Sequence, residues 1–160
     1  TFIIHARKAW LKGLSPKENR EIPPLDYERV YRLKEKFHSL NIVVNGGIKS
    51  IQDSLNHLQF VDGVMLGREA YDNPYILTAV DTLIFNTVAC AKTRQDILLE
   101  MLPYIEHELQ KGTKITRITK HLLGLFKGLD GAKKIREFLV TLNNEMNPLD
   151  YKYFFSGTAK

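Results

Sequence analysis

The chain has 160 residues, an ordinary globular composition, a formal net charge of +5 and an isoelectric point near 9.3. This length suits one or two domains with a hydrophobic core, and the charge permits a nucleic-acid partner without requiring one. The single cysteine, Cys90, excludes an internal disulfide and a cysteine-rich metal site, which fits a reducing cytoplasm. The longest apolar run, residues 78–91, contains Asp81 and is too short to span a membrane.

The first part of the chain alternates strand-like and helix-like segments. Residues 1–4 predict a buried strand, and a long loop follows in which three prolines are expected to prevent regular structure. Asp26 is the predicted cap of the next helix, which we expect over residues 27–38. Two more buried strands are predicted over residues 42–44 and 64–66. Each is followed by a predicted helix, over residues 51–59 and about 75–85. This order is typical of a parallel sheet with right-handed crossovers.

The pattern changes after about residue 90, where no strand signal remains. Apolar residues at helical spacing predict helices over residues 93–110, 115–126 and 132–144. We therefore expect an α/β domain over residues 1–89 and a separate all-α domain over residues 90–150. Residues 151–160 form a tail without a clear assignment.

Two of the predicted strands end in glycine turns, Asn45-Gly46-Gly47 and Gly67-Arg68. The carboxyl ends of parallel strands meet at one edge of a sheet, so these turns should be neighbours, as at the phosphate-binding edge of many barrels. Glycines let the backbone approach an anion closely, and Arg68 adds a fixed positive charge. The alternative is that the turns are merely tight and need a positive φ.

His5 follows the first predicted strand, two residues before Arg7. A histidine at this place can bond a ligand heteroatom, and the adjacent cation can hold an anion. Without context, a structural histidine is the favoured alternative. The five histidines are too scattered to predict a metal site: His5, His38, His57, His107 and His121.

The carboxyl-terminal half contains a run of basic residues beside an apolar stripe. These side chains either form an ordinary solvated helix face or follow the phosphate backbone of an RNA. The residues are Lys114, Arg117, Lys120, His121, Lys133, Lys134 and Arg136.

Four motifs, HARKAWLKGLSPKENREIPPLDY, VVNGGI, GVMLGREAYDNPY and ITKHLLGLFKGLDGAKKIR, closely resemble the bacterial tRNA-dihydrouridine synthases of the A-type subgroup. The resemblance covers nearly the whole chain in the same order. It implies a flavoenzyme that reduces D-loop uridines (positions 20 and 20a of tRNA) to 5,6-dihydrouridine, with NADPH as reductant and FMN as cofactor. It also implies a fold: the last three βα units of a TIM (β/α)8 barrel, followed by a small all-α domain that grips tRNA.

The resemblance assigns roles to individual residues of this chain. Those expected to bind FMN are His5, Asn45, Gly46, Gly47, Gly67 and Arg68. Those expected to bind tRNA are Lys17, Arg20, Lys133 and Arg136, with Arg20 nearest the target nucleotide. Family members often carry arginine where this chain has Lys133, and a lysine loses the bidentate fork of a guanidinium.

The family's catalytic cysteine and a flavin-contacting lysine lie upstream of the position of Thr1, and Cys90 does not match the catalytic position. We therefore expect these 160 residues alone to show no turnover and at most weak FMN binding. The missing amino-terminal half of the barrel, or another copy of the chain, is the expected protein partner. Two alternatives remain, a non-enzymatic tRNA-binding remnant and another FMN-dependent TIM-barrel oxidoreductase such as dihydroorotate dehydrogenase. The second is disfavoured because a small substrate needs no basic loop or basic helical domain.

Overall fold

A computed structural model describes residues 1–88 and 92–141 of the chain. They fall into two compact units, Thr1–Glu69 and Ala70–Lys160, which are called the first and second units below. The predicted domain boundary at residues 89 and 90 lies outside the described residues, as do Cys90, the end of the last predicted helix and the tail. No helix among the described residues is long and apolar enough to cross a membrane.

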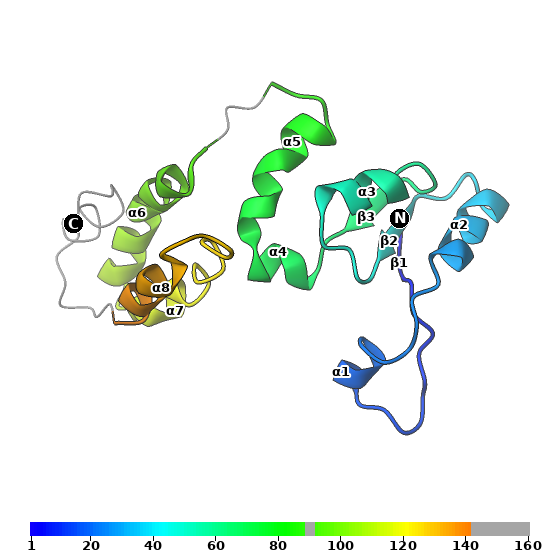
Figure 1. The fold of residues 1–160 in the computed structure, drawn as a ribbon, viewed down its shortest axis with the longest axis horizontal. Coiled ribbons are helices and arrows are strands. Elements are labelled where there is room, and N and C mark those ends of the chain that lie inside the picture. Colours follow the sequence, from blue (N-terminus) through cyan, green and yellow to red (C-terminus); the bar gives the residue numbers. More distant parts are fainter. Residues whose placement is uncertain (89–91, 142–160) are drawn as a thin grey trace. The chain divides into compact units, whose positions relative to one another are not determined.

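The first unit is built on a three-stranded parallel sheet in the order β1-β2-β3 (Figure 1). The strands β1 (Phe2–His5), β2 (Ile42–Asn45) and β3 (Gly63–Met65) lie within one residue of their predicted positions. Ile4, Val44 and Val64 are in register and point toward the helices, where they form a core with the buried Val30. The predicted parallel α/β architecture is therefore confirmed for this unit.

The prediction that the first strand is buried is wrong. Phe2 and Ile3 keep 55% and 58% of their surface exposed, whereas Val44 of β2 keeps none. The reason is the position of β1 at the edge, since within the described residues it pairs with β2 alone. An edge strand of a parallel sheet has neither a second neighbour nor full cover on its faces.

Two helices cover one face of this sheet. Asp26 caps α2 (Tyr27–Lys36), as predicted, by accepting a hydrogen bond of 3.0 Å from the N–H of Arg29. Ser50 caps α3 (Ile51–His57) in the same way through the N–H of Asp53 at 3.0 Å. Both helices end two residues before their predicted ends, because the spacing of apolar residues in the sequence locates helix ends poorly.

The loop between β1 and α2 contains a short helix, α1 (Pro16–Asn19), which contradicts the prediction that its prolines prevent regular structure. Ser15 and Glu18 form a capping box in which each side chain accepts a hydrogen bond from the other residue's backbone N–H. Pro16 occupies the first helical position, where a missing N–H costs nothing. The proline therefore starts a helix here.

The segment after β3 differs from the single predicted helix over residues 75–85. It contains α4 (Arg68–Asp72), a 3₁₀ helix η1 (Pro74–Ala79) and α5 (Val80–Leu83). The sequence pattern missed α4 entirely. Asn73 separates α4 from η1, because it precedes Pro74 and the residue before a proline avoids the helical conformation.

The second unit contains three further helices, α6 (Arg94–Gln110), α7 (Ile115–Thr119) and α8 (Ala132–Thr141), gathered into one bundle in Figure 1. Its core joins all three: Leu98, Ile105, Ile115, Ile118, Leu122, Leu125, Phe126, Ala132 and Leu139. The predicted helix over residues 115–126 is too long. After Thr119 the chain continues in tight turns that include Gly124 and Gly128, because glycine weakens helix interiors.

Candidate ligand site at the carboxyl edge of the sheet

His5 and Asn45 lie side by side at the carboxyl ends of their strands. They are in register and belong to the face of the sheet opposite the helices. A Cβ atom added to Gly46 would lie 2.9 Å from the His5 ring, and one added to Gly67 would lie 4.0 Å from Oδ1 of Asn45. The structure therefore brings these predicted site residues together at one edge of the first unit.

The turn after β2 can be made only with glycine. Gly46 and Gly47 have φ values of +121° and +72°, which L side chains rarely adopt. A Cβ atom on Gly47 would also lie 2.6 Å from Cδ1 of Leu25. Gly67 has no such backbone requirement. Thus the tight-turn alternative describes the backbone correctly, and the same turn also leaves Gly47 exposed at the mouth of the site.

The edge of the sheet is electropositive. The pKa of His5 is lowered from its ordinary value of 6.5, first by desolvation and then by the charges of Arg7, Arg20 and Arg68. Arg68 already holds an acidic oxygen, because its Nη1 donates to Oε1 of Glu21 at 2.8 Å. Both side chains are exposed, so this ion pair is worth little and a stronger anion can replace the carboxylate.

Arg7 has a different role from the anion-holding one that its position beside His5 suggested. Its Nη1 donates to the carbonyl oxygens of Glu21, at 3.1 Å, and Pro23. Its backbone also forms an antiparallel bridge with Leu25. Arg7 therefore joins the two ends of the loop between β1 and α2. Its positive charge also lowers the pKa of His5.

The closed loop presents two of the residues predicted to bind tRNA. Asn19 crosses the loop, accepting from the N–H of Trp10 at 2.8 Å and donating to the Trp10 carbonyl at 2.9 Å. Lys17 belongs to α1 and Arg20 is its carboxyl-terminal cap, and both are exposed. The loop is therefore an ordered basic projection of the first unit.

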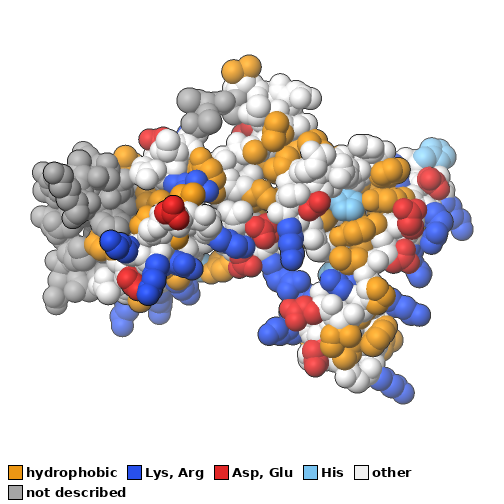
Figure 2. All heavy atoms as spheres, in the orientation of Figure 1, with side chains coloured by type: hydrophobic (Ala, Val, Ile, Leu, Met, Phe, Trp, Pro, Cys, Tyr) orange, Lys and Arg blue, Asp and Glu red, His pale blue; other side chains and the backbone are white. Residues whose placement is uncertain are grey.

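The second unit carries a basic surface that begins at the end of α6 and includes α7 and α8. Between residues 111 and 141 only Asp130 and Glu137 are acidic. Two of the residues predicted to bind tRNA lie on this surface. Nζ of Lys133 lies 3.8 Å from Oε1 of Glu137. Nε of Arg136 donates a hydrogen bond of 3.2 Å to the Ala132 carbonyl. The exposed basic residues are Lys111, Lys114, Arg117, Lys120, Lys127, Lys133, Lys134 and Arg136. Figure 2 shows lysine and arginine side chains, in blue, over this unit, with some acidic side chains, in red, between them.

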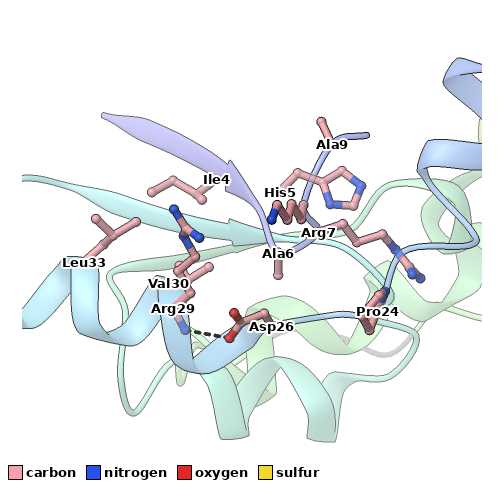
Figure 3. A pocket seen from close by; sticks show the side chains of 11 residues that line it. Ile4, His5, Ala6, Arg7, Ala9, Pro24, Asp26, Arg29, Val30 and Leu33 are labelled. Atoms are coloured by element: carbon pink, nitrogen blue, oxygen red, sulfur yellow. Dashed lines mark hydrogen bonds between the residues drawn. The ribbon is translucent and has the colours of Figure 1, made fainter. Parts of the chain in front are cut away.

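A cavity of about 440 Å³ lies next to β1, but it is a poor candidate for the same ligand. Figure 3 shows its walls, formed by the end of β1 and the first turns of α2, with Ile4, Val30 and Leu33 as the apolar part. Neither glycine turn lines it. His5 and Arg7 also line it, so the cavity adjoins the candidate site at the end of β1 without including its glycine turns.

An edge with two glycine turns, a histidine and an exposed arginine suits an anionic ligand, but many α/β proteins share such an edge. The decisive observation is that residues 1–152 match the dihydrouridine synthase (Dus) family. The chain belongs to the dihydrouridine synthase family.

This chain is similar in sequence to individual members of the dihydrouridine synthase family. The chain is 56% identical over 138 residues to a tRNA-dihydrouridine(20/20a) synthase of Shewanella oneidensis, and 58% identical over 138 residues to one of Escherichia coli K12. The alignments cover 86% of this chain and 41% and 40% of those relatives. The chain thus spans about two fifths of the length of the curated relatives it matches.

Sequence reasoning missed two residues of this candidate site. Glu21 pairs with Arg68, and Tyr27 donates a hydrogen bond to the carbonyl of Gly46 at 2.7 Å. Both are far in sequence from their partners, so no local pattern indicated them. Ser15 and Glu18, by contrast, follow the capping-box spacing, and that signal could have located α1. The described residues contain no group of three or more side chains able to hold a metal ion.

Proposed function

We propose that this chain is the carboxyl-terminal part of a tRNA-dihydrouridine synthase. The whole enzyme would reduce D-loop uridines, those at positions 20 and 20a, to 5,6-dihydrouridine with NADPH through FMN. The observation that carries the proposal is the Gly46-Gly47 turn, whose positive φ angles and close approach to His5 place a glycine backbone at the carboxyl edge of the sheet. The relatives are tRNA-dihydrouridine(20/20a) synthases, which supports the substrate and the positions. Such an enzyme would work in the cytoplasm, where tRNA is found.

The residues of this edge fit the FMN phosphate. The turn lets the backbone approach an anion closely, and the Arg68 guanidinium already donates a hydrogen bond to the carboxylate of Glu21. Asn45 and Gly67 complete this end of the site, and His5, neutral because its pKa is lowered, would contact the flavin. When bound, FMN supplies the hydride that passes from NADPH to the uracil ring. The proton-donating cysteine would come from outside these residues.

We also propose that β1, β2 and β3 are the last three strands of a (β/α)8 barrel. The edge of β1 has no strand partner among the described residues, and Ile3 and Met65 are exposed, which supports this proposal. Both side chains lie on the face that a barrel would enclose. The amino-terminal half of the barrel, or another copy of this chain, would then cover them. Residues 90–150 would form the tRNA-binding domain.

The proposed tRNA contacts lie on both units. Lys17 and Arg20 project from the ordered loop of the first unit, and Lys133 and Arg136 lie on α8 in the basic surface of the second. Phosphate contacts from such side chains position an RNA and make its binding depend on salt. A uridine must leave its base stack to reach a flavin, so contacts that hold the surrounding backbone are needed.

The FMN site is tested by titrating the chain with FMN and following flavin fluorescence. Arg68→Ala should weaken FMN binding about ten- to a hundredfold, because a charge-assisted hydrogen bond contributes about 1.5–3 kcal/mol. Arg32→Ala, which removes an exposed arginine of α2 outside the site, should leave the affinity unchanged. Equal affinities of all three proteins for FMN would contradict the assignment of Arg68.

The tRNA contacts are tested by measuring the affinity for unmodified tRNA at several salt concentrations. Arg20→Ala and Arg136→Ala should each weaken binding and reduce the slope of log affinity against log salt by about 1, while FMN binding stays unchanged. Arg32→Ala again serves as the charge-matched control. If it lowers the slope as much as the other two variants, binding is nonspecific. Retained tRNA binding without any FMN binding would favour the remnant interpretation.

A further inference from the structure

Tyr27 is the side chain that supports the Gly46-Gly47 turn from behind. Its hydroxyl donates a hydrogen bond of 2.7 Å to the carbonyl oxygen of Gly46, across 19 positions of the sequence. A Cβ atom placed on Gly47 would lie 3.1 Å from the same hydroxyl. The first residue of α2 therefore touches both glycines of the turn.

The hydrogen bond fixes the direction of an N–H group. In a trans peptide the C=O of one residue and the N–H of the next point in opposite directions. Because Tyr27 holds the Gly46 carbonyl toward α2, the N–H of Gly47 is directed away from α2. Among the described residues none accepts a hydrogen bond from this N–H, and Gly47 is exposed. A donor is thus held ready for an external acceptor.

The ring of Tyr27 is itself held in place. It packs against the ring of His57 with centroids 4.3 Å apart, and Nδ1 of His57 lies 2.6 Å from the hydroxyl of Tyr31. His57 is nearly fully buried, and desolvation lowers its pKa, so its ring is uncharged at neutral pH. Desolvation also raises the pKa of Tyr27, which keeps its hydroxyl protonated as a donor.

We propose that Tyr27 is a positioning residue for phosphate recognition: by holding the Gly46 carbonyl, it aims the Gly47 N–H at the phosphate of the bound flavin nucleotide. This inference rests on the proposed FMN site and adds to it a residue that touches the turn and not the ligand. The inference concerns the phosphate alone and not the rest of the ligand. Riboflavin has the same ring system as FMN but no phosphate, so the Gly47 N–H should not strengthen its binding.

The test compares Tyr27→Phe with Tyr104→Phe in fluorescence titrations with FMN and with riboflavin. Tyr27→Phe removes only the hydroxyl that holds the turn, so FMN affinity should fall about three- to tenfold, as expected for one hydrogen bond. Its riboflavin affinity should not change. Tyr104→Phe removes an exposed hydroxyl of α6 in the second unit, and both of its affinities should match those of the unaltered chain.

The carbonyl carbon chemical shift of Gly46 gives a second readout that needs no ligand. It should change in Tyr27→Phe and stay the same in Tyr104→Phe, because only the first change removes the hydrogen bond to that carbonyl. An equal loss of FMN and riboflavin affinity would show a merely structural role and overturn the inference. Unchanged FMN affinity in Tyr27→Phe would also overturn it while leaving the FMN site intact. If the unaltered chain binds neither flavin, the proposed site itself fails, and the inference fails with it.

Discussion

Replacing Gly47 by alanine should abolish FMN binding, because the new methyl group collides with the structure that forms the turn. The Cβ atom would lie 2.6 Å from Cδ1 of Leu25, and φ at this position is +72°. Strain of this kind costs about 1–3 kcal/mol, so the turn should open or shift. The measurement is FMN titration by fluorescence, together with the free energy of unfolding in urea.

Gly112→Ala is the matched control for this prediction. Gly112 also has a positive φ, +81°, but a Cβ atom there would meet nothing within 4 Å, and it lies at the end of α6 in the second unit. This change should cost about 1 kcal/mol of stability through backbone strain alone and leave FMN binding unaltered. If Gly47→Ala binds FMN as well as Gly112→Ala does, the turn is not part of the ligand site.

Replacing Gly124 by alanine should have the largest effect on the second unit. A Cβ atom would lie 2.6 Å from the carbonyl oxygen of Asp72 and 2.9 Å from that of Tyr71, and these are backbone atoms that cannot turn aside. The Tyr71 hydroxyl also lies 2.9 Å from Nδ1 of His121, so this contact should be lost as the segments separate. Overpacking at such a contact costs about 1–3 kcal/mol. Thermal unfolding followed by circular dichroism measures it.

Gly128→Ala controls for the change of glycine to alanine within the same segment. Gly128 has a φ of +80° and open space around its Cα, so only backbone strain opposes the substitution. A melting temperature lowered more by Gly124→Ala than by Gly128→Ala is the expected result. The opposite order would mean that the close approach of Gly124 to the Asp72 backbone contributes little to stability.

Patterns among neighbouring residues correctly predicted the strands and helices that such local patterns stabilise. The alternation of short apolar runs and helical spacing predicted three parallel strands and the helices between them. Asp26 identified the start of α2, since a side-chain cap acts within three residues. The motifs also identified the family, and the glycine turns marked the edge of the sheet at which the candidate site lies.

The elements that the sequence misjudged depend on groups far along the chain. Phe2 and Ile3 look like buried strand residues, but whether they are covered depends on a second neighbouring strand. The helix expected from Ile115 stops at Thr119, and the next turns bring Gly124 against the backbone of Asp72. Apolar spacing contains no information about either contact.

The same distinction applies to the site. The sequence determined that His5, the Asn45-Gly46-Gly47 turn and Arg68 occur at strand ends. Only the tertiary structure decided that Glu21 pairs with Arg68, that Arg7 clamps the loop and that Tyr27 holds the carbonyl of Gly46. Hydrogen bonds and ion pairs act over about 3 Å in space and between any two positions in the chain, so folding alone brings such partners within reach.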